Sequence, residues 1–170
     1  IVFRKTIVSP EVDTDGVAIS SPVGLNAGTI KDSSTINAVL TFTVPNTSGV
    51  LVDSQGPQIT LVSAPLDATY VTGQNLNFAV DYNEAVTVTG TPRLTLNVGG
   101  TTRYANYLSG SGTSTLIFRS SIVSNDVNAN GISMTASMDM NGGTIQDVST
   151  NNAGTSLTAP LLTGVMVDAI

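Results

Sequence analysis

Acidic side chains carry the main potential for site chemistry in this chain, which contains 12 Asp and Glu residues but no His and no Cys. Carboxylate and carboxamide oxygens suit Ca²⁺, which takes six to eight oxygen ligands in proteins. Zinc sites built from Cys and His, Cys nucleophiles and the Ser-His-Asp triad are excluded, because the residues that they need are missing. The composition therefore points away from enzymes and toward a structural role.

The first candidate calcium site lies beside residues 52–57, a segment with a glycine and a proline that we predict to be a short, fairly stiff joint. Asp53 ends a strand at this joint. If strand 58–62 runs away from the joint and strand 75–82 returns, the turn at residues 83–84 lies at the same end of the domain as Asp53. An ordinary solvated turn is the alternative interpretation. The predicted ligands are Asp53, Asp81, Asn83 and Glu84.

A second candidate occupies residues 11–16, where acids alternate as they do at the start of a calcium loop. The segment lacks the closing glutamate of such a loop, and Asp-Thr-Asp-Gly also commonly forms a β-turn. Both interpretations remain open. The ligands would be Glu11, Asp13 and Asp15.

An internal repeat organises the chain. Residues 1–53 align with residues 116–168 without a gap at an offset of 115, with identities at about 22 of 53 positions. A period this long indicates tandem domains rather than a solenoid. We therefore expect residues 54–168 to be one complete repeat and residues 1–53 to be the second part of a preceding one, so that the chain is a fragment of a longer array. The identities include Phe3/Phe118, Arg4/Arg119, Gly16/Gly131, Asn26/Asn141, Asp32/Asp147 and Asp53/Asp168.

The repeat extends the list of candidate ligands. Asp168 corresponds to Asp53 and would serve the next joint, whereas Asp126 corresponds to Glu11. Asn128 and Asn130 replace the other two acids of the second candidate, so any calcium affinity should be lower in the complete copy.

Residues 1–53 lack a counterpart of residues 54–115, which leaves an apolar edge uncovered. We expect this part either to pair with another chain or to compete with residues 116–168 for the segment 54–115. Independent folding of residues 54–168 is the alternative.

The fold expected is an all-β, antiparallel sandwich of the immunoglobulin-like Greek-key type, with a closed barrel as the structural alternative. In residues 75–82, apolar residues at even positions alternate with mostly polar ones, which indicates a strand with one buried face. Glycine and asparagine pairs between such runs are typical of tight hairpins. The predicted strands are 58–62, 70–72, 75–82, 86–88, 93–98, 103–108, 115–119, 132–138 and 164–167.

The segments 70–100, 107–118 and 141–147 resemble the bacterial immunoglobulin-like repeats of giant RTX adhesins. The resemblance implies a secreted protein of the bacterial cell surface, exported by type I secretion. Many copies of the repeat would hold a terminal binding region away from the cell, with neighbouring repeats of the same chain as partners. It also implies that extracellular calcium stiffens the array.

Other classes of function find little support in the sequence. The six Lys and Arg residues are scattered and the net charge is −6, which argues against nucleic acid, and no apolar run is long enough to predict membrane insertion. Asp81 and Glu84 could form a glycosidase pair, but no substrate cleft is evident, so we expect no enzyme. The open alternative is a glycan- or protein-binding module that uses Tyr104 or Tyr107, side chains that could equally pack between strands.

Overall fold

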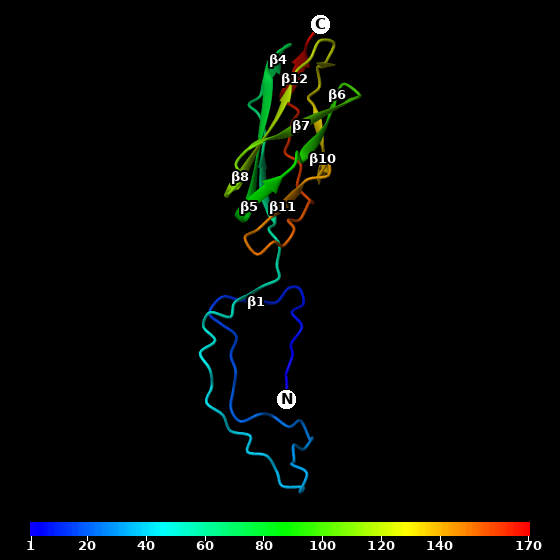
Figure 1. The fold of residues 1–170 in the computed structure, drawn as a ribbon. Coiled ribbons are helices and arrows are strands. Elements are labelled where there is room, and N and C mark those ends of the chain that lie inside the picture. Colours follow the sequence, from blue (N-terminus) through cyan, green and yellow to red (C-terminus); the bar gives the residue numbers. More distant parts are fainter. The chain divides into compact units, whose positions relative to one another are not determined.

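The computed structural model describes residues 1–170 and consists of strands, turns and extended segments without helices (Figure 1). The chain divides into two compact units, Ile1–Gln55 and Gly56–Ile170. The expectation of an all-β fold is confirmed.

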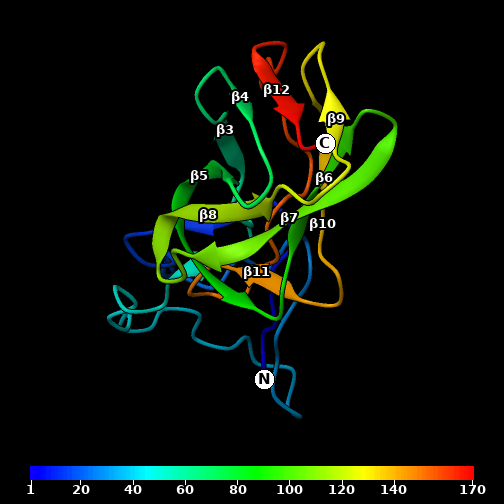
Figure 2. The same ribbon diagram turned by 90° about the horizontal axis from the view of Figure 1, so that it is seen from above.

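The second unit is a curled, sandwich-like arrangement of two sheets (Figure 2). The larger, seven-stranded sheet has the order β10-β6-β7-β8-β5-β11, with β3 paired to β5. The smaller sheet has the order β4-β12-β9, in which β4 and β12 are the one parallel pair. The strands are β3 (Ile59–Ser63), β4 (Ala68–Tyr70), β5 (Asn75–Thr89), β6 (Arg93–Val98), β7 (Thr101–Ser109), β8 (Thr113–Ser121), β9 (Val127–Asn128), β10 (Ser133–Asp139), β11 (Thr144–Gln146) and β12 (Val165–Asp168).

The core of this unit follows from the alternation in its central strands. Phe78 of β5 lies opposite Phe118 of β8, and both rings are fully buried. Tyr107 of β7 packs edge-on against Phe118, with ring centroids 6.0 Å apart. Leu, Val and Ile residues of β5, β6, β8, β11 and β12 make up much of the remaining core.

The strand predictions differ from the structure most at Asn83 and Glu84. The predicted turn is wrong, because β5 continues through both residues and its register on β8 shifts between Asp81 and Val86. Asn83 is held extended by two bonds to Gln58: its amide donates to the Gln58 carbonyl at 3.0 Å, and its side-chain oxygen accepts from the Gln58 amide at 2.7 Å. The chain therefore bulges rather than reverses here.

The first unit contains two short strands, β1 (Val12–Asp13) and β2 (Val52–Asp53), which pair antiparallel. Beyond them, two long extended segments are joined by isolated backbone hydrogen bonds such as Val17 N to Val50 O at 3.1 Å. Its apolar residues stay largely exposed, so the hydrophobic core lies in the second unit.

Several backbone hydrogen bonds within the first unit have a counterpart within the second unit, at positions 115 residues further along the chain. The β1–β2 register also recurs, since Val12 opposite Asp53 corresponds to Val127 opposite Asp168. The corresponding hydrogen bonds, with the bond of the first unit given before that of the second, are Glu11 N to Val8 O and Asp126 N to Val123 O; Val17 N to Val50 O and Ile132 N to Val165 O; Val23 N to Leu40 O and Met138 N to Thr155 O; Gly28 N to Leu25 O and Gly143 N to Met140 O; Asp32 N to Ile36 O and Asp147 N to Asn151 O; and Ala38 N to Ile30 O and Ala153 N to Ile145 O.

Candidate metal centre

Two carboxylates meet within the second unit. Glu84 lies in the bulged part of β5 and Asp147 follows β11, and their carboxylate oxygens lie within 4.8 Å of each other. Asp147 is 3% exposed, whereas Glu84 is partly buried. Two negative groups at this separation repel each other, so a divalent cation between them would be stabilised by both.

The loop after β11 orients Asp147. The Asn151 amide donates to Asp147 Oδ1 at 2.8 Å, and the Asn151 side-chain nitrogen donates to Asp147 Oδ2 at 2.9 Å. Thr150 closes the loop with a positive φ of 68°, and its amide donates to the Asp147 carbonyl at 3.2 Å. The carboxylate is therefore fixed in place by the backbone around it.

The second unit begins beside both acids. A Cβ on Gly56 would lie 2.0 Å from the Asn152 carbonyl oxygen, so the glycine lets the chain pass directly against the Asp147 loop. Gln58, two residues later, is bonded to Asn83, the neighbour of Glu84. The start of this unit therefore contacts both the bulged part of β5 and the loop after β11.

Asp81 and Asn83, the other predicted ligands in β5, are engaged in structural bonds. Asp81 Oδ1 accepts from the Thr115 hydroxyl, and Asn83 Oδ1 accepts from Gln58. Asp53 is exposed at the end of β2, where its Oδ1 accepts from the Gln55 amide at 3.2 Å.

In the first unit, the predicted loop acids do not converge as a ligand set. Glu11 forms an ion pair with Lys5, and this hydrogen bond is the main cause that lowers the pKa of Glu11. Asp13 Oδ1 accepts from the amides of Asp15 and Gly16, at 3.3 and 2.7 Å, which is the pattern of an aspartate closing a turn. Asp15 is exposed.

Asp126, the counterpart of Glu11, is 2% exposed and has a structural partner. Its Oδ1 accepts from two nitrogens of Arg103, at 2.8 and 2.6 Å, while its Oδ2 accepts from the Val123 amide at 3.2 Å. This bonding raises the pKa of Arg103. Through this ion pair, Asp126 links β7 to the loop before β9. Asp168 is exposed in β12.

Asp147 was missed as a ligand in the sequence analysis. The sequence did carry a signal for it, because Asp32 and Asp147 are identical residues at the 115-residue offset. Asp32 makes the same turn as Asp147: its Oδ1 accepts from the Ile36 amide at 2.9 Å, and Thr35 has the same φ of 68° as Thr150.

Of the two tyrosines proposed as binding residues, Tyr104 is 38% exposed and Tyr107 is partly buried. The Tyr107 ring packs on Phe118 and its hydroxyl accepts from the Ser111 amide at 2.9 Å. The Arg93 guanidinium lies over one face of the Tyr104 ring, 3.8 Å from the ring centroid.

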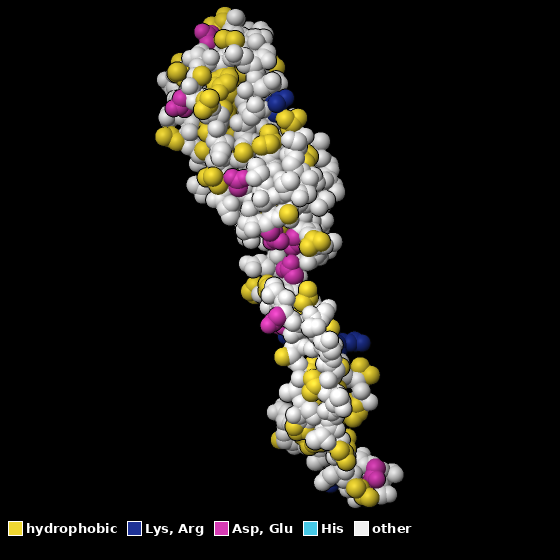
Figure 3. Space-filling model, turned by 90° about the vertical axis from the view of Figure 1, so that its left-hand side faces the viewer, with side chains coloured by type: hydrophobic (Ala, Val, Ile, Leu, Met, Phe, Trp, Pro, Cys, Tyr) yellow, Lys and Arg dark blue, Asp and Glu magenta, His cyan; other side chains and the backbone are white.

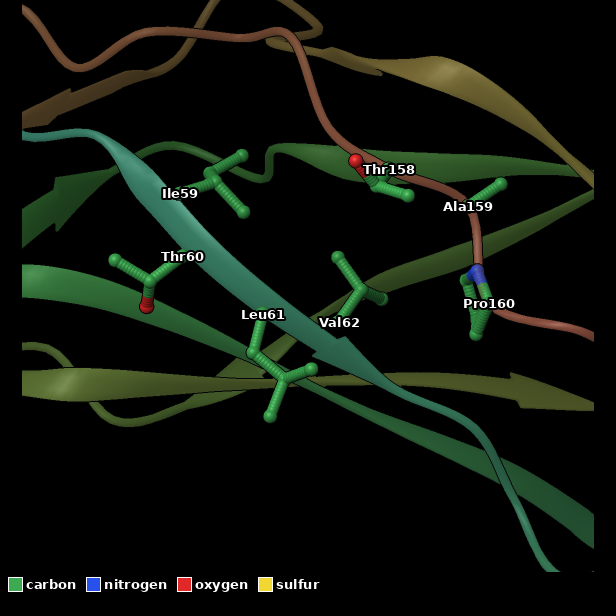
Figure 4. A pocket seen from close by; sticks show the side chains of 7 residues that line it. All are labelled: Ile59, Thr60, Leu61, Val62, Thr158, Ala159 and Pro160. Atoms are coloured by element: carbon green, nitrogen blue, oxygen red, sulfur yellow. The ribbon is translucent and has the colours of Figure 1, made fainter.

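A cavity of about 440 Å³ lies between β3 and residues 158–160 (Figure 4). Ile59 and Val62 point toward that segment, whereas Thr60 and Leu61 point away from it. The lining holds no acid, base or other titratable side chain. It offers apolar contact and the Thr158 hydroxyl, not a group that could transfer a proton.

Comparison with models of known protein families, with curated proteins and with solved structures gives no significant match. The structure contains no helix with the length and apolar character that a membrane-spanning helix needs.

Proposed function

We propose that this chain is a non-enzymatic spacer built from tandem immunoglobulin-like Greek-key repeats, in the stalk of a large secreted adhesin of a bacterial surface. The observation that carries the proposal is the recurrence of backbone hydrogen bonds and strand register at an offset of 115 residues. Chance similarity of sequence would not reproduce the same turns, whereas two copies of one domain would. The resemblance of residues 70–100 to adhesin repeats supplies the cellular context.

Calcium at the joint between repeats is the second element of the proposal. Glu84 and Asp147 supply two carboxylates beside the start of the second unit. Asp53 precedes Gly56 by three residues, and a chain reaches at most about 3.6 Å per residue, so its Cα lies within about 11 Å of the Gly56 Cα. We assign Asp53 as the third carboxylate. Backbone carbonyls and water would complete the oxygen shell that Ca²⁺ requires.

A cation in this position would act as a mechanical clamp. It would tie the last strand of one repeat to β5 and to the loop after β11 of the next, and three carboxylates would repel one another without it. The joint would then bend less freely when calcium is present. Asp168, the counterpart of Asp53, would play the same part at the following joint.

A calcium titration followed by thermal melting tests this function. At a calcium concentration 100 times Kd, binding to the folded state alone adds about 2.7 kcal/mol. An unfolding entropy of about 2.1 cal/mol/K per residue, over about 115 residues, converts this to a rise in Tm of about 11 °C.

Glu84→Gln should remove most of that rise, because it deletes one ligand charge and keeps the size of the side chain. Asp67→Asn is the matched control, since Asp67 is an exposed acid beside Gly164, and it should retain the full rise. An unchanged Tm at millimolar calcium would remove the metal from the proposal, and equal rises for both variants would remove Glu84 from the site.

A further inference from the structure

The first unit presents an apolar face whose counterpart in the second unit is the hydrophobic core. Phe3 is 71% exposed and its counterpart Phe118 is 0% exposed; Val50 is 53% exposed and its counterpart Val165 is 0% exposed. A hollow of about 830 Å³ on this unit is lined mainly by apolar side chains, among them Phe3, Val17, Ile19, Val23 and Phe42. Figure 3 shows hydrophobic side chains at the surface of this unit.

The second unit shows what covers such a face. Phe118 lies opposite Phe78 of β5, and Val165 lies opposite Ala68 of β4. The Ile122 amide donates to the Gln74 carbonyl at 2.9 Å, at the start of β5. All three partners belong to the segment 54–115, for which the first unit has no counterpart.

Polar side chains of the second unit also bond to the segment 54–115, and their counterparts in the first unit lack that partner. Arg119 Nε donates to Asn77 Oδ1 at 2.8 Å, and the identical Arg4 occupies its position in the first unit. Asp126 is neutralised by Arg103 of the segment 54–115, whereas its counterpart Glu11 takes Lys5 from its own unit.

One contact would not carry over. Asp139, the partner of Arg93, is replaced by Gly24 in the first unit, so this ion pair would be lost there.

We propose that the apolar face of residues 1–53 is a docking surface for a segment equivalent to residues 54–115, which adds its strands in the register seen in the second unit and completes a second sandwich. The inference rests on the tandem-repeat part of the proposed function and does not require calcium. The occupant that fits this face is such a segment joined ahead of Ile1, because in the alignment Thr115, the last residue of the segment 54–115, corresponds to the position before Ile1.

A second copy of the chain is a poorer occupant. Each copy carries one segment 54–115, and its own residues 116–168 already bury their core against it. Exchange between copies would therefore leave as many apolar faces uncovered as before. A covalently joined segment also avoids the entropy cost of association.

The test joins a second copy of residues 54–115 ahead of Ile1 and compares this extended chain with the chain itself. The protein has no cysteine, so single thiols report on exposure. Val50→Cys probes the face, and Ser33→Cys is the control, because Ser33 is exposed and its counterpart Val148 is 94% exposed.

In the extended chain, the thiol at position 50 should react with a water-soluble reagent at least about a hundredfold more slowly, because reaction would then require local unfolding. The thiol at position 33 should react at an unchanged rate. The calorimetric unfolding enthalpy should roughly double, since it scales with the number of folded residues. Phe78→Asp in the added copy alone should restore the reactivity at position 50.

Equal reactivity at position 50 in both chains would overturn the inference. So would protection of that thiol in the unextended chain together with a doubled molecular mass, which would show that a second copy covers the face. The calcium shift of the unextended chain is measured separately, so failure of the docking surface and failure of the calcium joint can be told apart.

Discussion

Phe118 and Phe3 are aligned at the 115-residue offset and lie in opposite environments, which makes them a matched pair for mutation. Phe118 is fully buried between Phe78 and Tyr107, whereas Phe3 is 71% exposed. Phe118→Ala should destabilise the second unit by about 3–5 kcal/mol, because it removes buried apolar surface and leaves a cavity. Phe3→Ala should change stability by no more than about 0.5 kcal/mol.

The assay is thermal unfolding followed by circular dichroism and calorimetry. With an unfolding entropy of about 0.24 kcal/mol/K for about 115 residues, Phe118→Ala should lower Tm by about 12–20 °C. A total stability of roughly 6–17 kcal/mol for a unit of this size would leave most of the protein folded at 25 °C. Similar losses for both variants, or a loss below about 1 kcal/mol for Phe118→Ala, would refute the assignment of the core to the second unit alone.

Two further predictions concern the backbone and the charges of the second unit. Gly131 has a φ of +86° and a Cβ there would lie 2.4 Å from the Leu162 carbonyl oxygen, so Gly131→Ala should lower the urea midpoint strongly, and a wild-type midpoint would contradict the geometry. The hydrogen bond from Arg93 lowers the pKa of Asp139, so their pair stabilises the fold above the ordinary carboxyl pKa and this contribution is lost as the pH falls through the lowered value. The difference in urea midpoint between wild type and Asp139→Asn should accordingly be constant above about pH 5 and shrink as the pH falls through the lowered carboxyl pKa; a difference that grew on acidification would have the wrong sign.

The strand pattern could be predicted from the sequence where local signals were strong. Strand 93–98 has the predicted bounds, because alternating Leu and Val residues are closed by Gly99 and Gly100, which both have positive φ. The predicted turn at Asn83 and Glu84 failed, because these polar residues have turn propensity but are held extended by Gln58, a contact across the sheet.

The candidate metal centre was predicted only in part. Glu84 was proposed from its place near the joint, whereas Asp147 was passed over although the repeat marked it. Sequence spacing could not bring them together, since they are 63 positions apart and meet only because β11 pairs with β5. Asp126 shows the reverse, since it was proposed as a ligand but in the structure its carboxylate is bonded to Arg103.

The sequence by itself determined the class of fold, the 115-residue offset and the absence of His and Cys chemistry, because these depend on residue types and on local alternation. Only the tertiary structure decided which of the two aligned segments, residues 1–53 or residues 116–168, has its apolar face buried. Phe3 and Phe118 are identical in type and are each followed by an arginine, but burial depends on a partner surface, and only Phe118 has β5 and β7 to pack against.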